Sequence, residues 1–132
     1  MYYKQTLILA AKEAMGMAYA PYSNFLVGAA VITDDGKIYT GCNIENSSYG
    51  LSNCAERTAI FKAISEGAKK IKAIAVIGNT LQPISPCGAC RQVLLEFADT
   101  NILVILANTE GEIKEFSLEE LLPYSFQIPL ED

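Results

Sequence analysis

The sequence predicts an α/β fold, a three-layer α/β/α sandwich around a mixed sheet of about five strands. Helix-like and strand-like patterns alternate along the 132 residues in the order α-β-β-α-β-α-β-β-α. The third and fourth strand-like segments are apolar on both faces, so helices must cover both sides of the sheet. The length fits one domain, and we expect residues 1–132 to form it.

The first part of the chain predicts a helix and a hairpin. Apolar residues recur at helical spacing over residues 5–18, and Pro21 follows the end of this pattern. Residues 26–33 are continuously apolar and include β-branched side chains, and residues 37–43 alternate between apolar and polar. The turn residues 34–36 lie between these segments, which is typical of a β-hairpin.

The middle of the chain predicts two helices separated by a strand. We expect Asn53 to cap a helix over residues 54–66. Residues 72–78 have the composition of a buried strand. A further helix is expected over residues 87–98, because Pro86 suits the first helical turn, where no backbone N–H is needed.

The last part of the chain predicts two strands and a short helix. Residues 102–107 and residues 112–116 have strand composition, with turn residues between them. Ser117 is expected to cap the last helix, with Glu120 at the capping-box position.

Composition excludes several classes of function. The net charge of -5 argues against a polyanionic partner such as DNA, RNA or anionic lipid. The chain has no histidine, which excludes imidazole bases and imidazole metal ligands. The apolar run at residues 7–11 is too short for a signal peptide, and no stretch is long enough to span a membrane. We therefore expect a cytoplasmic protein whose four cysteines are thiols or metal ligands.

Three of these cysteines fall at predicted helix starts. Cys54 opens one helix, and Cys87 and Cys90 lie three residues apart at the start of another. A helix N-terminus lowers the pKa of a thiol and favours the thiolate that binds zinc. Three sulfur ligands leave the fourth tetrahedral position for water, as in catalytic zinc sites. Glu56 lies close enough to take a proton from that water.

Two alternatives remain open on the residues alone. Cys87 and Cys90 form a C-x-x-C pair before a helix, as in thioredoxin-like redox proteins, but this hypothesis leaves Cys54 and Glu56 unexplained. The zinc could also be structural, in a non-catalytic binding module, with Cys42 as a fourth ligand. We favour a packing role for Cys42, which falls at a predicted strand end.

The two cysteine segments also carry a family resemblance. Cys54-Ala55-Glu56-Arg57 followed by Pro86-Cys87-Gly88-Ala89-Cys90 is similar to the paired signature of zinc deaminases. The chain resembles the small homotetrameric cytidine deaminases with three cysteine ligands. Further matching segments are residues 20–23, 27–30, 41–46 and 121–123, together with Phe25 and Phe126.

The resemblance implies a mechanism and its residues. Cys54, Cys87 and Cys90 would each ligate one Zn²⁺ per subunit, whose hydroxide attacks C4 of the pyrimidine. Glu56 would shuttle protons to N3 and to the departing ammonia. Arg57 would donate hydrogen bonds to the ligand sulfurs and so offset the surplus negative charge of three thiolates around Zn²⁺.

The resemblance also implies the substrate contacts. Asn43 and Glu45 would bind the ribose hydroxyls, the Ala55 backbone would lie against the base, and Phe25 would form part of the pocket wall. Phe126 would reach into the site of a neighbouring subunit in a homotetramer with shared active sites.

Substrate choice follows from charge and from the resemblance together. The implied reaction converts cytidine and 2′-deoxycytidine to the uridine forms, as in pyrimidine salvage. Scattered basic residues and a net charge of -5 favour a free nucleoside over a polynucleotide. Another aminopyrimidine nucleoside or an analogue is the alternative substrate, since blasticidin-type deaminases share the zinc segments.

Overall fold

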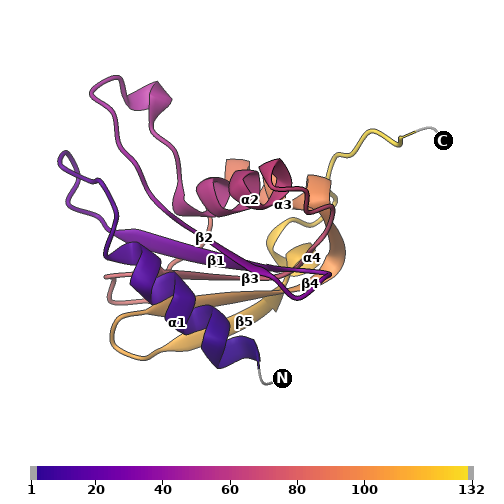
Figure 1. The fold of residues 1–132 in the computed structure, drawn as a ribbon, viewed down its shortest axis with the longest axis horizontal. Helices are drawn as coiled ribbons and strands as arrows, with labels where there is room; N and C mark the ends of the chain where they lie inside the picture. The colour runs from indigo at the N-terminus through magenta and orange to yellow at the C-terminus, as the bar shows by residue number, and fades with distance from the viewer. Residues whose placement is uncertain (1–2, 131–132) are drawn as a thin grey trace.

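The computed structural model describes residues 3–130 and has the expected α/β architecture (Figure 1). The strands are β1 (Val27–Thr33), β2 (Ile38–Cys42), β3 (Ile71–Gly78), β4 (Ala98–Asn108) and β5 (Ile113–Ser117). The helices are α1 (Tyr3–Met15), α2 (Ala55–Ser65), α3 (Gly88–Phe97) and α4 (Leu118–Leu121), and a 3₁₀ turn, η1 (Tyr49–Leu51), precedes α2. The predicted element order is therefore confirmed.

The five strands form one mixed sheet in the order β2-β1-β3-β4-β5. Only the β3/β4 pair is parallel, and the other three pairs are antiparallel. Gly28 pairs with Cys42, and Val27 pairs with Gly78. The start of β1 and the carboxyl ends of β2 and β3 therefore lie together at the same end of the sheet.

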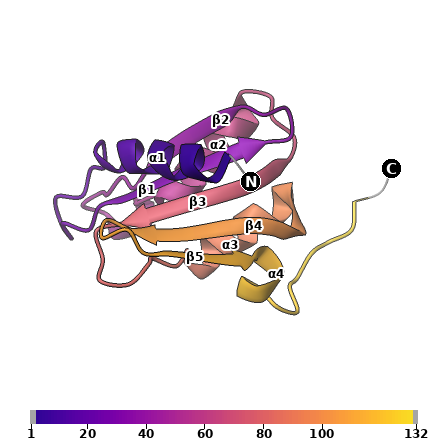
Figure 2. The same cartoon turned by 90° about the horizontal axis from the view of Figure 1, so that it is seen from below.

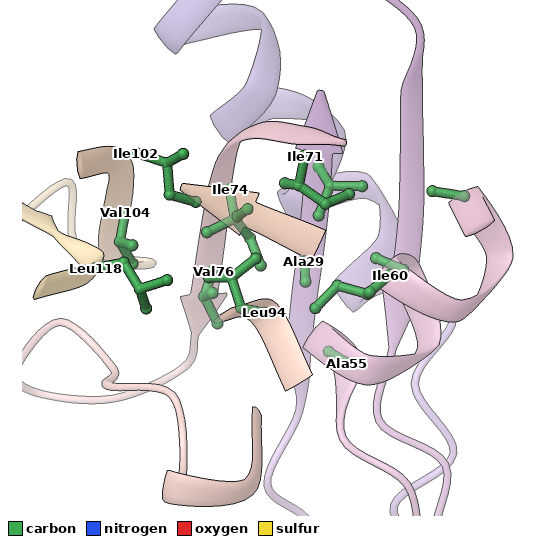
Figure 3. Packing of buried hydrophobic residues seen from close by; sticks show 14 of the residues in the cluster. Ala29, Ala55, Ile60, Ile71, Ile74, Val76, Leu94, Ile102, Val104 and Leu118 are labelled. Atoms are coloured by element: carbon green, nitrogen blue, oxygen red, sulfur yellow. The ribbon is translucent and has the colours of Figure 1, made fainter. Parts of the chain in front are cut away.

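Helices cover both faces of the sheet, as the doubly apolar strands predict (Figure 2). On one face α1 packs over β1 and β3, where Leu7 and Ala11 are fully buried. On the other face α2 and α3 lie over the larger apolar cluster, with Leu94 of α3 beside Val76 of β3 (Figure 3). Within residues 3–130, no helix has the length and apolar character needed to cross a membrane.

Two glycines allow helices to lie directly on the strands. A Cβ at Gly28 would stand 2.0 Å from the carbonyl oxygen of Ala11 in α1. A Cβ at Gly41 would stand 2.6 Å from the carbonyl oxygen of Ala55 and 2.5 Å from the amide nitrogen of Ala59 in α2. Because glycine has no side chain, α1 and the start of α2 can pack closely against the sheet at these two positions.

Several element boundaries differ from the expectations. The first helix ends at Met15 rather than near residue 18, and hydrogen bonds between residues three apart follow it, because Gly16 weakens the helix. Cys54, and not Asn53, is the N-cap of α2. The prediction of Asn53 was wrong: its backbone pairs with Ile44, and its side-chain amide donates a hydrogen bond of 3.1 Å to the Thr58 hydroxyl.

The fourth strand also starts earlier than expected. Helix α3 ends at Phe97, and β4 begins at Ala98 rather than at residue 102. Ala98 pairs with Ile71 ahead of a register shift in the β3/β4 ladder. Aspartate and asparagine are disfavoured in strands, so the composition of residues 99–101 did not indicate that β4 begins before residue 102. The capping box of Ser117 and Glu120 at α4 is confirmed.

Candidate metal centre and active site

The three predicted ligand cysteines converge at the sheet edge where α2 and α3 begin. Cys54 is the N-cap of α2, Cys87 is the N-cap of α3, and Cys90 lies in the first turn of α3. The sulfur atoms of Cys54 and Cys87 are 3.8 Å apart, and those of Cys87 and Cys90 are 3.3 Å apart. All three cysteines are free thiols. Because Cys54 joins the C-x-x-C pair, the cluster is a trio and not an isolated redox pair.

The geometry of this trio fits a zinc ion. Zn–S bonds of about 2.3 Å in a tetrahedral site place ligand sulfurs about 3.8 Å from each other. The three sulfur atoms here all lie within 4.8 Å of one another, and Cys42 is not part of the group. Cys42 instead lines a separate hollow with Gly41, Thr58 and Lys62. The structure therefore does not support Cys42 as a fourth ligand.

The electrostatics of the trio also favour a cation. Hydrogen bonding from the Cys90 thiol, helped by the Arg57 guanidinium, lowers the pKa of Cys54 to about 5. The same hydrogen bond to Cys54, together with burial, raises the pKa of Cys90. One thiolate therefore keeps its neighbour protonated, because adjacent like charges repel. A divalent ion between the sulfurs would remove this repulsion and allow further ionisation.

Glu56 and Arg57 follow Cys54 in the first turn of α2. Glu56 is only 5% exposed, and burial raises the pKa of its carboxyl group. Arg57 donates a hydrogen bond of 3.3 Å from Nη2 to the Cys54 sulfur, which raises the pKa of the guanidinium. The buried Nε of Arg57 has no partner within residues 3–130. The centre thus pairs a buried carboxyl group with a cation that neutralises sulfur charge.

A pocket of about 230 Å³ opens directly onto this cluster. Six of the site residues expected from the sequence line it: Phe25, Asn43, Glu45, Cys54, Glu56 and Cys87. The other lining residues are Val27, Ser52, Asn53, Ile84 and Ser85. The pocket lies at the carboxyl ends of β2 and β3, where loops gather ligand-binding groups in open α/β sheets. Most of the predicted site residues are therefore brought together in one cavity.

Asn43 and Glu45 hold the loop that forms one wall of the pocket. The Asn43 amide accepts a hydrogen bond of 2.9 Å from the Val27 N–H and donates one of 2.7 Å to the Phe25 carbonyl. The Glu45 carboxylate accepts bonds from the Tyr22 and Ser23 N–H groups and from the Ser23 hydroxyl. The bond from that hydroxyl is the main reason that the pKa of Glu45 is lowered. Both polar side chains therefore orient the segment that carries Phe25.

Of the three remaining residues predicted to contact the substrate, only Phe25 lines the pocket. Phe25 lines the pocket and is partly exposed. Ala55 is fully buried beneath the first turn of α2 and is not a lining residue. Phe126 lies away from the pocket and is 71% exposed, and its carbonyl accepts a hydrogen bond of 2.9 Å from Gln92. Within this single chain, Phe126 is thus not part of the site.

Sequence reasoning missed several parts of the pocket wall. Ser52 and Ile84 come from irregular segments whose positions depend on tertiary packing, and no local pattern identifies them. Ser85 directly precedes Pro86 and also lines the pocket, although its sequence context indicates only a helix start.

Comparison with known sequences gives a consistent result. Residues 1–106 match the family described as the cytidine and deoxycytidylate deaminase zinc-binding region. The chain is 53% identical over 122 residues to a cytidine deaminase of Sporosarcina psychrophila, covering 92% of this chain and 90% of that protein. It is also 53% identical over 123 residues to a cytidine deaminase of Halalkalibacterium halodurans, covering 93% of each.

Solved structures show the same fold. The crystal structure of cytidine deaminase from Burkholderia pseudomallei is similar with a TM-score of 0.90 and 54% identity, covering 93% of this chain and 98% of that chain. The cytidine deaminase from Mycobacterium tuberculosis is similar with a TM-score of 0.83 and 40% identity, covering 94% and 97%. The α/β architecture predicted from the sequence is therefore shared with these enzymes.

Proposed function

The chain belongs to the cytidine deaminase family, and we propose that it hydrolyses cytidine and 2′-deoxycytidine to uridine and 2′-deoxyuridine with release of ammonia. The matching family model describes a zinc-binding region, and the cysteine trio is consistent with one Zn²⁺ per subunit. The observation that carries the proposal is that Cys54 and Cys87 of the trio line the same pocket as Glu56.

Cys54, Cys87 and Cys90 would hold the zinc ion. When bound, Zn²⁺ supplies a Lewis acid that lets a water molecule ionise near neutral pH. Three thiolates exceed the charge of the ion by one, and the Arg57 hydrogen bond to Cys54 offsets this surplus. The start of α2 and the start of α3 add the positive ends of two helix dipoles, which stabilise the anionic sulfurs.

Glu56 would move the protons of the reaction. Burial raises the pKa of Glu56, so its carboxylate is a stronger base than an exposed one. It would take a proton from the attacking water and deliver it to N3 of the pyrimidine as the C4–O bond forms. Glu56 would then carry the proton of the new C4 hydroxyl to the exocyclic amine, so that the C4–N bond breaks, ammonia leaves and the C4 carbonyl forms.

The pocket walls would select the substrate. Asn43 and Glu45 line the cavity. Besides the hydrogen bonds that hold the Phe25 segment, their side chains have further donor and acceptor positions, and these would bind the ribose hydroxyls. Phe25 would cover the nucleoside, and the Ala55 backbone at the start of α2 would face the base. The Glu45 carboxylate disfavours a phosphate nearby, which agrees with a free nucleoside as substrate and with the absence of a nucleic-acid partner.

The assembly and setting of the enzyme are also part of the proposal. We assign a homotetramer in which Phe126 completes the site of a neighbour, because Phe126 is largely exposed and lies outside the pocket of its own chain. The four free thiols fit a reducing compartment, which supports a cytoplasmic enzyme of pyrimidine salvage.

An ultraviolet assay tests the substrate assignment. Purified enzyme is incubated with cytidine, 2′-deoxycytidine, cytidine monophosphate and free cytosine. We expect turnover of the two nucleosides and little turnover of the nucleotide or the base. Comparable turnover of the nucleotide would remove the assignment to free nucleosides, and turnover of an aminopyrimidine analogue alone would favour the alternative substrate.

A further inference from the structure

A second arginine, Arg91, binds the segment that leads into α3. Its Nε donates to the Pro86 carbonyl over 2.9 Å, and its Nη2 donates to the Ser85 hydroxyl over 2.6 Å. Its Nη1 donates to the Leu121 carbonyl over 2.6 Å. We propose that Arg91 is a positioning residue that holds the Ser85 to Cys87 segment in register with the pocket. This inference rests on the proposed function.

The acceptors of Arg91 are groups that need a partner. Pro86 is buried, and a buried carbonyl without a hydrogen bond is costly. Leu121 is the last residue of α4, and the carbonyls of a helix end have no partner within the helix. One guanidinium therefore satisfies two orphaned carbonyls and one hydroxyl at the same time.

The anchor at Leu121 makes this network rigid. The capping box of Ser117 and Glu120 fixes the start of α4. Leu121 and Leu122 pack against the larger core cluster. The position of the Leu121 carbonyl is thus fixed by the core. Through its hydrogen bonds to this carbonyl and to Ser85 and Pro86, Arg91 ties the loop before α3 to the core.

The segment held by Arg91 contributes twice to the site. Ser85 lines the pocket, and Cys87 both lines the pocket and belongs to the sulfur trio. Cys87 is also the most exposed of the three cysteines, so its own packing constrains it least. Loss of the Arg91 network is therefore expected to loosen a pocket wall and one zinc ligand together.

Lysine cannot replace this arginine. The three acceptors lie in different directions around a planar group, and the rigid fork of a guanidinium presents several N–H donors at once. A lysine ammonium keeps the charge but is a single point at the end of a flexible chain. The proposal therefore predicts that Arg91→Lys behaves like Arg91→Met, whereas a purely electrostatic role would leave Arg91→Lys close to the wild type.

The experiment compares the zinc-loaded wild type with Arg91→Lys and Arg91→Met. Zinc release to a colorimetric chelator is expected to be about 10-fold faster in both variants, as for other groups that orient metal ligands. Amide hydrogen exchange of residues 84–90 is expected to accelerate. KM for cytidine is expected to rise more than kcat falls when zinc is saturating. Glu96→Gln, on an exposed position of α3, is the control that should leave all three measurements unchanged.

The outcomes separate this inference from the proposed function. If the variants lose thermal stability but keep wild-type zinc release and KM, Arg91 is merely structural and the inference is wrong. If Arg91→Met does not fold, Arg91→Lys and Ser85→Ala decide, and Ser85→Ala should give a smaller rise in KM. A wild-type chain that holds no zinc and deaminates nothing would instead defeat the proposed function.

Discussion

The sulfur atoms of Cys54 and Cys87, which are 33 residues apart in the sequence, lie 3.8 Å apart in the fold. Each cysteine is the N-cap of a helix, and neither side chain bonds its own helix backbone. The sulfurs are therefore free to share a ligand instead of capping. The sheet brings the two caps together because α2 and α3 lie over the same face.

Glu56→Gln tests the proton shuttle. Glutamine has the same shape and leaves the three sulfurs in place, so we expect the variant to retain zinc. Removing a general acid and base lowers turnover by about 10² to 10⁴-fold. Metal analysis and the cytidine assay on the same sample check both parts. Turnover at the wild-type level would end the assignment of Glu56 as the proton carrier.

Cys42→Ser tests the number of sulfur ligands. Because Cys42 lies outside the trio, we expect the variant to keep zinc and activity. Cys87→Ser is the matched change within the trio and is expected to lose both. If Cys42→Ser loses zinc, the ion has four protein ligands and the site is structural.

Gly41→Ala tests how closely α2 lies on the sheet. The new Cβ would meet the backbone of Ala55 and Ala59 at 2.5 to 2.6 Å, so α2 must shift. Overpacking of this kind lowers the free energy of unfolding by about 1–3 kcal/mol. Because Cys54 and Glu56 begin α2, we also expect activity to fall. Gly50→Ala is the control, since nothing lies within 4 Å of its added Cβ.

Glu45→Gln tests the ribose contact. A hydrogen bond to a charged group contributes about 1.5–3 kcal/mol, so KM for cytidine should rise by about 10-fold or more. Ser23→Ala removes the hydrogen bond from the Ser23 hydroxyl to Glu45 but keeps the Glu45 carboxylate. Its KM should change less. Equal increases in the two variants would mean that Glu45 acts only by holding the loop.

Mixing two impaired variants tests the shared site. Phe126→Ala is expected to be weakly active, and Glu56→Gln inactive. After subunit exchange, a site with Glu56 from one chain and Phe126 from its neighbour is complete again, so activity should exceed the sum of the separate samples. Size measurement of the wild type provides the control. A monomer with full activity would contradict the role of Phe126.

The fold class was predictable because its strongest signal is apolar pattern. Strands such as β1 and β3 are buried almost throughout, and only two helical layers can cover such a sheet. The capping box at Ser117 was equally local. The start of β4 at Ala98 was not predictable, because the pairing with β3 overrides the low strand propensity of Asp99.

The site divides in the same way. The cysteine trio could be predicted because spacing along the chain places two sulfurs on one helix start and the motif supplies the third. Ser52 and Ile84 could not, because they reach the pocket through the path of irregular loops. The hydrogen bond from Arg91 to the Leu121 carbonyl joins residues 30 apart, and no local pattern encodes such a contact.

Zinc titration of chelator-stripped protein tests the central claim most directly. Zinc is added in steps while deamination of cytidine is followed by ultraviolet absorbance. We expect no activity without zinc and a linear rise that saturates at one Zn²⁺ per chain. Full activity in the stripped protein, or saturation with zinc without any deamination, would contradict a catalytic ion held by Cys54, Cys87 and Cys90.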